Sequence, residues 1–149
     1  MALVKTVQMV NDTEAIVKIA GIGATGAETS TISLSADILT STQIVSGTPN
    51  VTIIGFQWAG EPGAIYKINR GGVRVASLLA DNGNFMDFIE LFPSENTNAT
   101  SNIDVQISTA AGAAIQGEVW LRLRKVSGYA NKIETGLYSV YDDLTQVGS

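Results

Sequence analysis

Carboxylates are the side chains of this chain best suited to chemistry, because its 149 residues include no histidine and no cysteine. The chain therefore lacks the usual proton carrier near neutral pH, the thiol nucleophile and the best soft metal ligand. A Ser-His-Asp triad is excluded, and no Gly-x-Ser-x-Gly elbow is present. Paired carboxylates perform acid–base catalysis in glycoside hydrolysis. The spacing selects no pair, however, among Glu90, Glu95, Asp104, Glu118 and Glu134.

Two short motifs resemble ligand-binding loops. Residues 21–26, Gly-Ile-Gly-Ala-Thr-Gly, match the pattern of dinucleotide-binding folds. That fold needs a helix after the motif, whereas residues 27–34 alternate like a strand, so we interpret residues 21–26 as a flexible loop. Residues 81–84, Asp-Asn-Gly-Asn, form with Asp87 a fragment of a calcium loop. Because the remaining ligands and flanking helices of such a loop are missing, a turn is favoured, with a cation held by Asp81 and Asp87 as the alternative.

Neither the remaining acidic pair nor the Asn-x-Thr triplets predict a site. Asp142 and Asp143 would point to opposite faces of a strand, so solvated charge explains them better than a cation site. Triplets that begin at Asn11, Asn50 and Asn98 would accept glycans in a secreted protein. The first residues show no signal peptide, so turns are the better explanation. We expect no cofactor and no resident metal.

Composition indicates the class of partner. Charged residues make up 15% of the chain, against about a quarter in typical domains. A sparsely charged surface rich in hydroxyls and amides suits a protein that packs against neighbours. The net charge of −5 argues against nucleic-acid binding, and no apolar run reaches the ~18 residues of a membrane span. The absence of cysteine fits a reducing cell interior or a particle that dispenses with disulfides.

Short runs of β-forming residues recur along the whole chain and are separated by turn signals. They predict one all-β domain over residues 1–149, an antiparallel two-sheet β-sandwich of jelly-roll or Ig-like type with about nine strands. Little helix is expected, at most a single turn over residues 36–39 capped by Ser35. Turns are predicted at residues 11–12 and 69–72. The last strands are expected at residues 129–134 and 137–141.

Three predicted strands carry clear apolar patterns. Residues 103–108 alternate, with Ile103, Val105 and Ile107 expected inside. Residues 51–58 are apolar on both faces, which predicts a central or covered strand with Trp58 in the core. Further strands are expected at residues 84–91 and at residues 116–125, where the core side chains are Val119, Leu121 and Leu123.

The most specific surface feature is the opposite face of the strand at residues 116–125. Trp120, Arg122 and Arg124 share this face with Glu118. Trp and Arg are enriched at interface hot spots and form cation–π contacts. The alternative is that Trp120 covers the sheet while the arginine stems lie over it. We expect a protein interface here, with a second anchor in the N-terminal arm at Leu3, Lys5 and Val7.

Residues 1–21, 50–60, 66–84 and 118–129 resemble small β-rich virion proteins of marine tailed phages, especially those that infect cyanobacteria. The resemblance spans most of the chain and lies in its overall texture, without a short diagnostic motif. It implies a structural role as a capsid decoration (cement) protein or as a small neck or tail component. It also implies that the chain has no catalytic residues.

These observations predict a non-enzymatic virion protein on the capsid surface, made in the host cytoplasm. Its partner would be the major capsid protein or another virion protein. It would act as a homo-oligomer, for example a trimer, that bridges capsid subunits through apolar surface and strand edges. Two alternatives stay open: a tail, neck or baseplate subunit, and a carbohydrate-binding β-sandwich with an exposed Trp.

Overall fold

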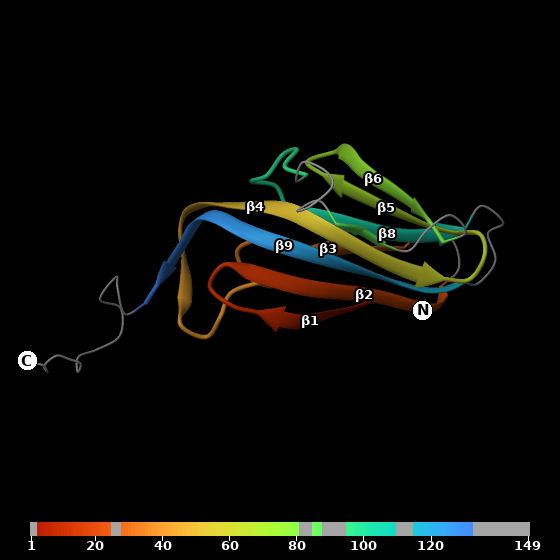
Figure 1. Cartoon of the computed structure of the whole chain (residues 1–149), viewed down its shortest axis with the longest axis horizontal. Coiled ribbons are helices and arrows are strands. Elements are labelled where there is room, and N and C mark those ends of the chain that lie inside the picture. The colour runs from red at the N-terminus through yellow and green to blue at the C-terminus, as the bar shows by residue number, and fades with distance from the viewer. Residues whose placement is uncertain (1–2, 25–27, 81–84, 88–94, 110–114, 133–149) are drawn as a thin grey trace, which may run out of the picture.

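The computed structural model describes residues 3–24, 28–80, 85–87, 95–109 and 115–132. They form nine strands and no helix (Figure 1). The strands are β1 (Val4–Val10), β2 (Glu14–Ala24), β3 (Glu28–Ile32), β4 (Gln43–Gly60), β5 (Ala64–Arg70), β6 (Val73–Leu79), β7 (Phe85–Asp87), β8 (Ile103–Thr109) and β9 (Ile115–Asn131). The all-β prediction is confirmed.

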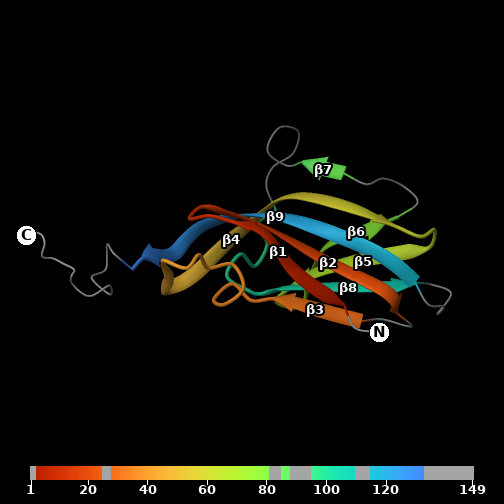
Figure 2. The same ribbon diagram turned by 90° about the horizontal axis from the view of Figure 1, so that it is seen from below.

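The strands form two antiparallel sheets (Figure 2). Their inward side chains form one buried core. The five-stranded sheet has the order β1-β2-β9-β4-β7, and the four-stranded sheet has the order β3-β8-β5-β6. The core lies between the sheets because apolar side chains of both point toward each other, among them Val17 and Leu121 from one sheet and Tyr66 and Val105 from the other.

Strand pairing follows a nested pattern. The innermost pair is the β5–β6 hairpin, and around it β4 pairs with β7, β3 with β8 and β2 with β9. Two further pairings, β4 with β9 and β5 with β8, join these four strand pairs into two sheets. The chain therefore crosses between the sheets repeatedly, and residues far apart in sequence become neighbours on one surface.

The alternating strands bury the side chains that the sequence pattern indicated. Ile103, Val105 and Ile107 of β8 are inaccessible to solvent, as are Val119, Leu121 and Leu123 of β9. Trp58 is 6% exposed and belongs to the core, as predicted. Each fully buried side chain of this size stabilises the fold by about 1.5–3 kcal/mol, before the entropy of ordering is subtracted.

A β-bulge explains the two apolar faces of β4. Ile53 pairs with Leu123 and Gly55 pairs with Arg122, so Ile54 is the extra residue. The extra residue changes which side chains point inward. Val51 and Ile53 face the core before the bulge, and Phe56 and Trp58 face it afterwards. The strand is thus central, as expected, between β9 and β7.

Tight turns lie where the sequence placed them. Asn11 Oδ1 accepts hydrogen bonds from Thr13 N and Glu14 N, which closes the β1–β2 turn. Gly71 and Gly72 connect β5 to β6 with φ of 56° and 80°. Two successive positive φ angles suit the right-handed twist of a two-residue hairpin.

Three local predictions differ from the structure in their bounds. The single turn predicted over residues 36–39 lies at residues 34–38 and starts at Ser33 instead of Ser35: Ser33 O accepts hydrogen bonds from Ala36 N and Asp37 N, and Asp37 Oδ2 accepts one from Ser33 N. The predicted loop at residues 21–26 begins later, since β2 continues through Ala24 beside β9. The strand predicted at 116–125 and the described part of the strand predicted at 129–134 belong to one continuous strand, β9, which ends at Asn131. Residues 137–141, and residues 84–91 apart from β7, lie outside the described residues.

Candidate functional site

Trp120, Arg122 and Arg124 lie on the outer face of β9, as the alternation predicted. Their inward neighbours on the strand fill the core, which leaves the outward side chains in contact with solvent. Trp120 is partly exposed and Arg124 is exposed, while the Arg122 side chain is 42% exposed. Glu118 lies on the same face and is partly exposed.

Neighbouring charges hold Trp120 and Arg122 in place. Trp120 Nε1 donates a hydrogen bond to Glu118 Oε2. The Lys18 ammonium lies 5.5 Å from the centre of the Trp120 ring, a cation–π contact worth about 0.5–1 kcal/mol at an exposed site. Arg122 forms an ion pair with Glu14 at 3.1 Å. Such contacts add little stability, but they fix the orientation of side chains that a partner would meet.

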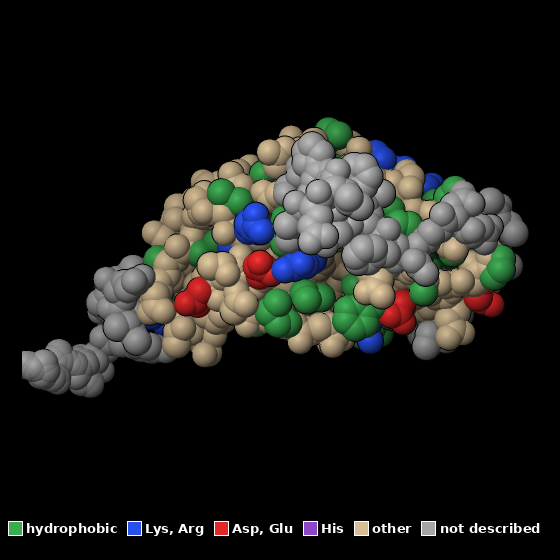
Figure 3. All heavy atoms as spheres, in the orientation of Figure 1, with side chains coloured by type: hydrophobic (Ala, Val, Ile, Leu, Met, Phe, Trp, Pro, Cys, Tyr) green, Lys and Arg blue, Asp and Glu red, His purple; other side chains and the backbone are tan. Residues whose placement is uncertain are grey.

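Strand register adds residues that the sequence analysis missed. Lys18 of β2 lies opposite Trp120, and Ile16 lies opposite Arg122. Met9 of β1 lies opposite Ile16. Figure 3 shows this surface, with hydrophobic side chains over β1 and β2 beside acidic and basic ones. We call it the five-strand face: Met9, Glu14, Ile16, Lys18, Glu118, Trp120, Arg122 and Arg124.

The residues of the predicted N-terminal anchor are not brought onto this face. Leu3 packs against the core. Lys5 Nζ forms an ion pair with Asp37 and donates a hydrogen bond to Thr31 O, which ties β1 to the four-stranded sheet. Val7 is 36% exposed and lies opposite Val17, whose side chain points into the core. Successive side chains of a strand point to opposite faces. The side chains of β1 that point outward are therefore not those of Lys5 and Val7 but those of the residues next to them.

A groove of about 560 Å³ lies at one end of the five-strand face, along β2, β9 and the end of β4. Ala20, Glu118 and Ala59 lie side by side on the three strands. The surface is hollowed here because the alanine side chains are small. The polar side chains that line the groove are those of Lys18, Glu61, Gln116 and Glu118. Glu61 Oε2 accepts a hydrogen bond from Gln116 N at 2.7 Å, which fixes one wall.

Tyr66 supports this groove from inside the core. Its hydroxyl donates a hydrogen bond to Ala59 O. A Cβ added at Gly60 or at Gly117 would lie 2.1 Å from the Tyr66 hydroxyl oxygen, so glycine is required at both positions. Burial raises the pKa of Tyr66 to about 12. The hydroxyl is therefore neutral at physiological pH and is able to donate this bond.

The outer face of the four-stranded sheet is different in character. Thr31 Oγ1 donates a hydrogen bond to Asp104 Oδ1 at 2.6 Å, and Gln106 Nε2 donates one to Thr29 Oγ1. Polar side chains cover most of this surface, which we call the four-strand face: Thr29, Thr31, Lys67, Asn69, Arg74, Ser77, Asp104 and Gln106. Ile65 and Leu79 form a small apolar area at one end, near β6.

The other candidate residues do not converge in the part of the chain that the structure describes. Glu118 and Asp104 lie on opposite outer faces of the molecule. Glu95 accepts hydrogen bonds from the backbone and side chain of Thr97. Among the described residues, no three acidic side chains gather to hold a metal ion. Several candidates lie outside the described residues: Glu90, Glu134, Asp142, Asp143 and residues 81–84.

Comparison with protein-family models, with curated proteins and with solved structures gives no match. In the described ranges, no helix has the length and hydrophobicity that a bilayer crossing requires.

Proposed function

We propose that the chain is a non-enzymatic virion structural protein, a decoration protein that binds the outer surface of a capsid through its five-strand face. The single observation that carries this proposal is the difference between the two outer faces. One presents a Trp together with aliphatic side chains and two arginines. The other, over its described residues, presents no Trp and combines hydroxyl and amide groups with Lys67, Arg74, Asp104 and a small apolar area. Interface hot spots are enriched in Trp and Arg.

The fold proposal that goes with this function is a β-sandwich of the jelly-roll type. It is supported by the nested pairing of β2 with β9, β3 with β8, β4 with β7 and β5 with β6. In a jelly roll, a long hairpin of nested strand pairs folds over into two sheets, which gives this pairing. An Ig-like sandwich does not have it. Jelly rolls are frequent in viral capsid and lectin domains, although fold alone does not decide function.

The mechanism of such a protein is adhesive. A protein that binds only the assembled shell stabilises the shell by mass action. Trp120 and Ile16 supply apolar area, while Arg122 and Lys18 supply donors for carbonyl and carboxylate groups of the capsid. Several copies, or a homo-oligomer such as a trimer, would multiply the effect through effective concentration.

Co-sedimentation with capsids of the phage that carries the gene tests this proposal. We expect the double variant Trp120→Ala, Arg122→Ala to bind at least about 100-fold more weakly, since each hot spot contributes about 2 kcal/mol. The matched control is Lys67→Ala, Gln106→Ala on the four-strand face, which should bind like the natural chain. Thermal unfolding of both variants verifies that they are folded.

Unchanged binding of a folded Trp120→Ala, Arg122→Ala variant would contradict the docking face. Binding of the natural chain to purified tails, with none to heads, would instead support a tail, neck or baseplate subunit.

The second candidate is a carbohydrate-binding module, favoured by the groove beside Trp120. Carboxylate, amide and ammonium groups line it, and these groups bind sugar hydroxyls. A titration of tryptophan fluorescence with sugars tests this function. A saturable change that is lost in Glu118→Gln but kept in the four-strand control variant would favour it over capsid decoration.

A further inference from the structure

Lys125 is buried, although lysine is rarely found inside proteins. The residue is 8% exposed and follows Leu123 on the inward side of β9. Its Nζ donates hydrogen bonds to Asn11 O at 2.9 Å and to Gln43 Oε1. In the part of the chain that the structure describes, no carboxylate lies within ion-pair distance of this amine. Both acceptors are neutral oxygens. An uncharged amine has two N–H donors, so these two acceptors satisfy it.

The charged and titratable groups around Lys125 are few. Asp12 lies in the β1–β2 turn and favours the charged form of the amine. The Tyr129 ring lies 5.3 Å from Nζ, a cation–π contact that favours the charged amine. Burial raises the pKa of Tyr129 to about 12, so this phenol stays neutral. Desolvation is the largest effect and lowers the pKa of Lys125 to about 8.

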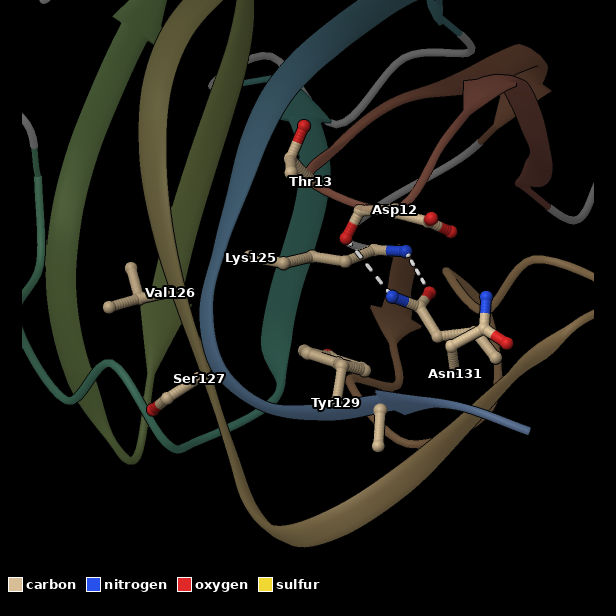
Figure 4. A pocket seen from close by; sticks show the side chains of 9 residues that line it. Asp12, Thr13, Lys125, Val126, Ser127, Tyr129 and Asn131 are labelled. Atoms are coloured by element: carbon tan, nitrogen blue, oxygen red, sulfur yellow. Dashed lines mark hydrogen bonds between the residues drawn. The ribbon is translucent and has the colours of Figure 1, made fainter. Parts of the chain in front are cut away.

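Lys125 also lines a cavity of about 260 Å³ (Figure 4). The cavity lies where the β1–β2 turn, the start of β4 and the end of β9 meet, and Thr13, Ser127 and Asn131 contribute to its lining. Figure 4 shows the Lys125 side chain extending alongside Asp12. Lys125 Nζ donates a hydrogen bond to Gln43 Oε1, and Gln43 Nε2 donates one to Asp12 O. The amine is thus removed from bulk water and is still next to a space that a small molecule can enter.

We propose that Lys125 is a selectively reactive amine and that the cavity beside it takes small aldehydes, which form an imine with Lys125. The neutral amine attacks the carbonyl carbon through its lone pair, and the carbonyl oxygen takes up a proton. The resulting carbinolamine loses water to give the C=N bond. The step consumes one aldehyde, releases one water and needs no oxidant or reductant. Desolvated lysines are activated for imine formation in this way.

This site is independent of the proposed docking function, because Lys125 points into the core side of β9 and the five-strand face lies on the opposite side. An ordinary lysine with a pKa of about 10.4 is about 0.1% neutral at pH 7.5. An amine with a pKa of about 8 is neutral in about a quarter of molecules at that pH, which predicts roughly 200-fold more of the reactive form.

Reductive labelling of the full chain tests the proposal. Glycolaldehyde at low conversion traps imines when sodium cyanoborohydride reduces them, and mass spectrometry of chymotryptic peptides assigns each modified amine. At pH 7.5 we expect Lys125 to react at least tenfold faster than Lys18 and Lys67, with a rate that levels off above about pH 8. The N-terminal amine reacts as well, and peptide mapping separates it.

Two variants complete the experiment. Lys125→Arg keeps the positive charge and should remove the fast-reacting site, whereas Lys67→Arg should leave it unchanged. If Lys125→Arg does not fold, the labelling map of the natural chain still decides. A Lys125 rate equal to or below that of Lys18 would overturn the proposal, as would a rate that still rises steeply at pH 10.

Discussion

Arg70 is fully buried and binds backbone carbonyls instead of a carboxylate. Its guanidinium donates hydrogen bonds to Val51 O, Ala99 O and Ser101 O. These contacts fasten the segment before β8 to β4. Burial lowers the pKa of Arg70, but arginine stays charged because its ordinary value is far above neutrality.

Replacing Arg70 by Met should destabilise the fold by about 3 kcal/mol or more, because buried carbonyls would lose their donors. Arg70→Lys should cost less, since an ammonium is able to satisfy part of the set. Urea unfolding with a constant m-value measures both changes. Equal stability of Arg70→Met and the natural chain would show that water replaces the guanidinium.

Lys125 should also leave a signature in the pH dependence of stability. Its pKa is about 8 in the folded chain against 10.5 for the unperturbed group. Between these values the unfolded state binds more protons, so the free energy of unfolding should rise with pH. Tyr66 and Tyr129, with pKa values raised to about 12, should reverse the trend above pH 10, because the unfolded state then loses protons first.

The variant Lys125→Met should abolish the rise between pH 8 and 10 and keep the decline above pH 10. Urea unfolding from pH 7 to 11 measures the profile. A rise that persists in this variant would assign the effect to another group.

Sequence alternation alone was sufficient to place Trp120 and Arg122 on an outer face. It could not find Lys18 or Ile16 as their neighbours, because that depends on the register between β2 and β9. The sequence pattern also gave no sign that Arg70 and Lys125 are buried. Their acceptors, such as Ser101 O and Asn11 O, come from segments far along the chain.

At the scale of elements, β4 and β9 are longer than their patterns suggested. Strand β4 begins at Gln43, before the apolar run that starts at Val51, and its first part pairs with the end of β9 around Tyr129. Polar and small residues there gave no strand signal, and Ser-Gly at 127–128 resembled a turn. Bulges absorb the irregular residues, so the ladder continues where sequence propensity predicts an interruption.

Gly128 is the position on which this extension depends. Its φ is +86°, and an added Cβ would lie 2.3 Å from Thr48 O of the paired strand. Gly72 has a similar φ of +80° but nothing within 4 Å of an added Cβ. Gly72→Ala should cost about 1 kcal/mol from the backbone angle alone.

Gly128→Ala should cost clearly more than Gly72→Ala, because the two backbones must also separate. Thermal unfolding of both variants gives the comparison. The same loss of stability in both would mean that the contact with Thr48 relaxes freely.

At the scale of the molecule, two side chains bridge the open sides between the sheets. On one side, Trp58 Nε1 donates a hydrogen bond to Leu79 O of β6 at 3.0 Å. On the other, Lys5 Nζ donates one to Thr31 O of β3 at 2.8 Å. Both β6 and β3 are edge strands of the four-stranded sheet. Each of these hydrogen bonds occupies a backbone carbonyl of an edge strand. Without it, that carbonyl would be free to pair with a strand of another chain.

These bridges should act locally. Trp58→Phe removes one donor and should speed amide hydrogen exchange in β6 by at least about fivefold, the effect of one lost hydrogen bond, with β3 unchanged. Lys5→Met should speed exchange in β1 and β3 and leave β6 unchanged. Hydrogen exchange followed by mass spectrometry reads the two edges separately, and equal changes at both edges in either variant would contradict local closure.

The nested order of the strands also has a consequence for biosynthesis. Glu14 binds Arg122, 108 residues later, so β2 has no partner on its β9 side until the ribosome has synthesised the chain through β9. The β1–β2 hairpin can form as soon as both strands emerge. Among the nested pairs, β5–β6 is complete first, and each outer pair waits for a later strand. Such distant pairing slows folding and leaves the early strands exposed to aggregation. A chain that stops before β9 would therefore leave the first two strands without a sheet to join.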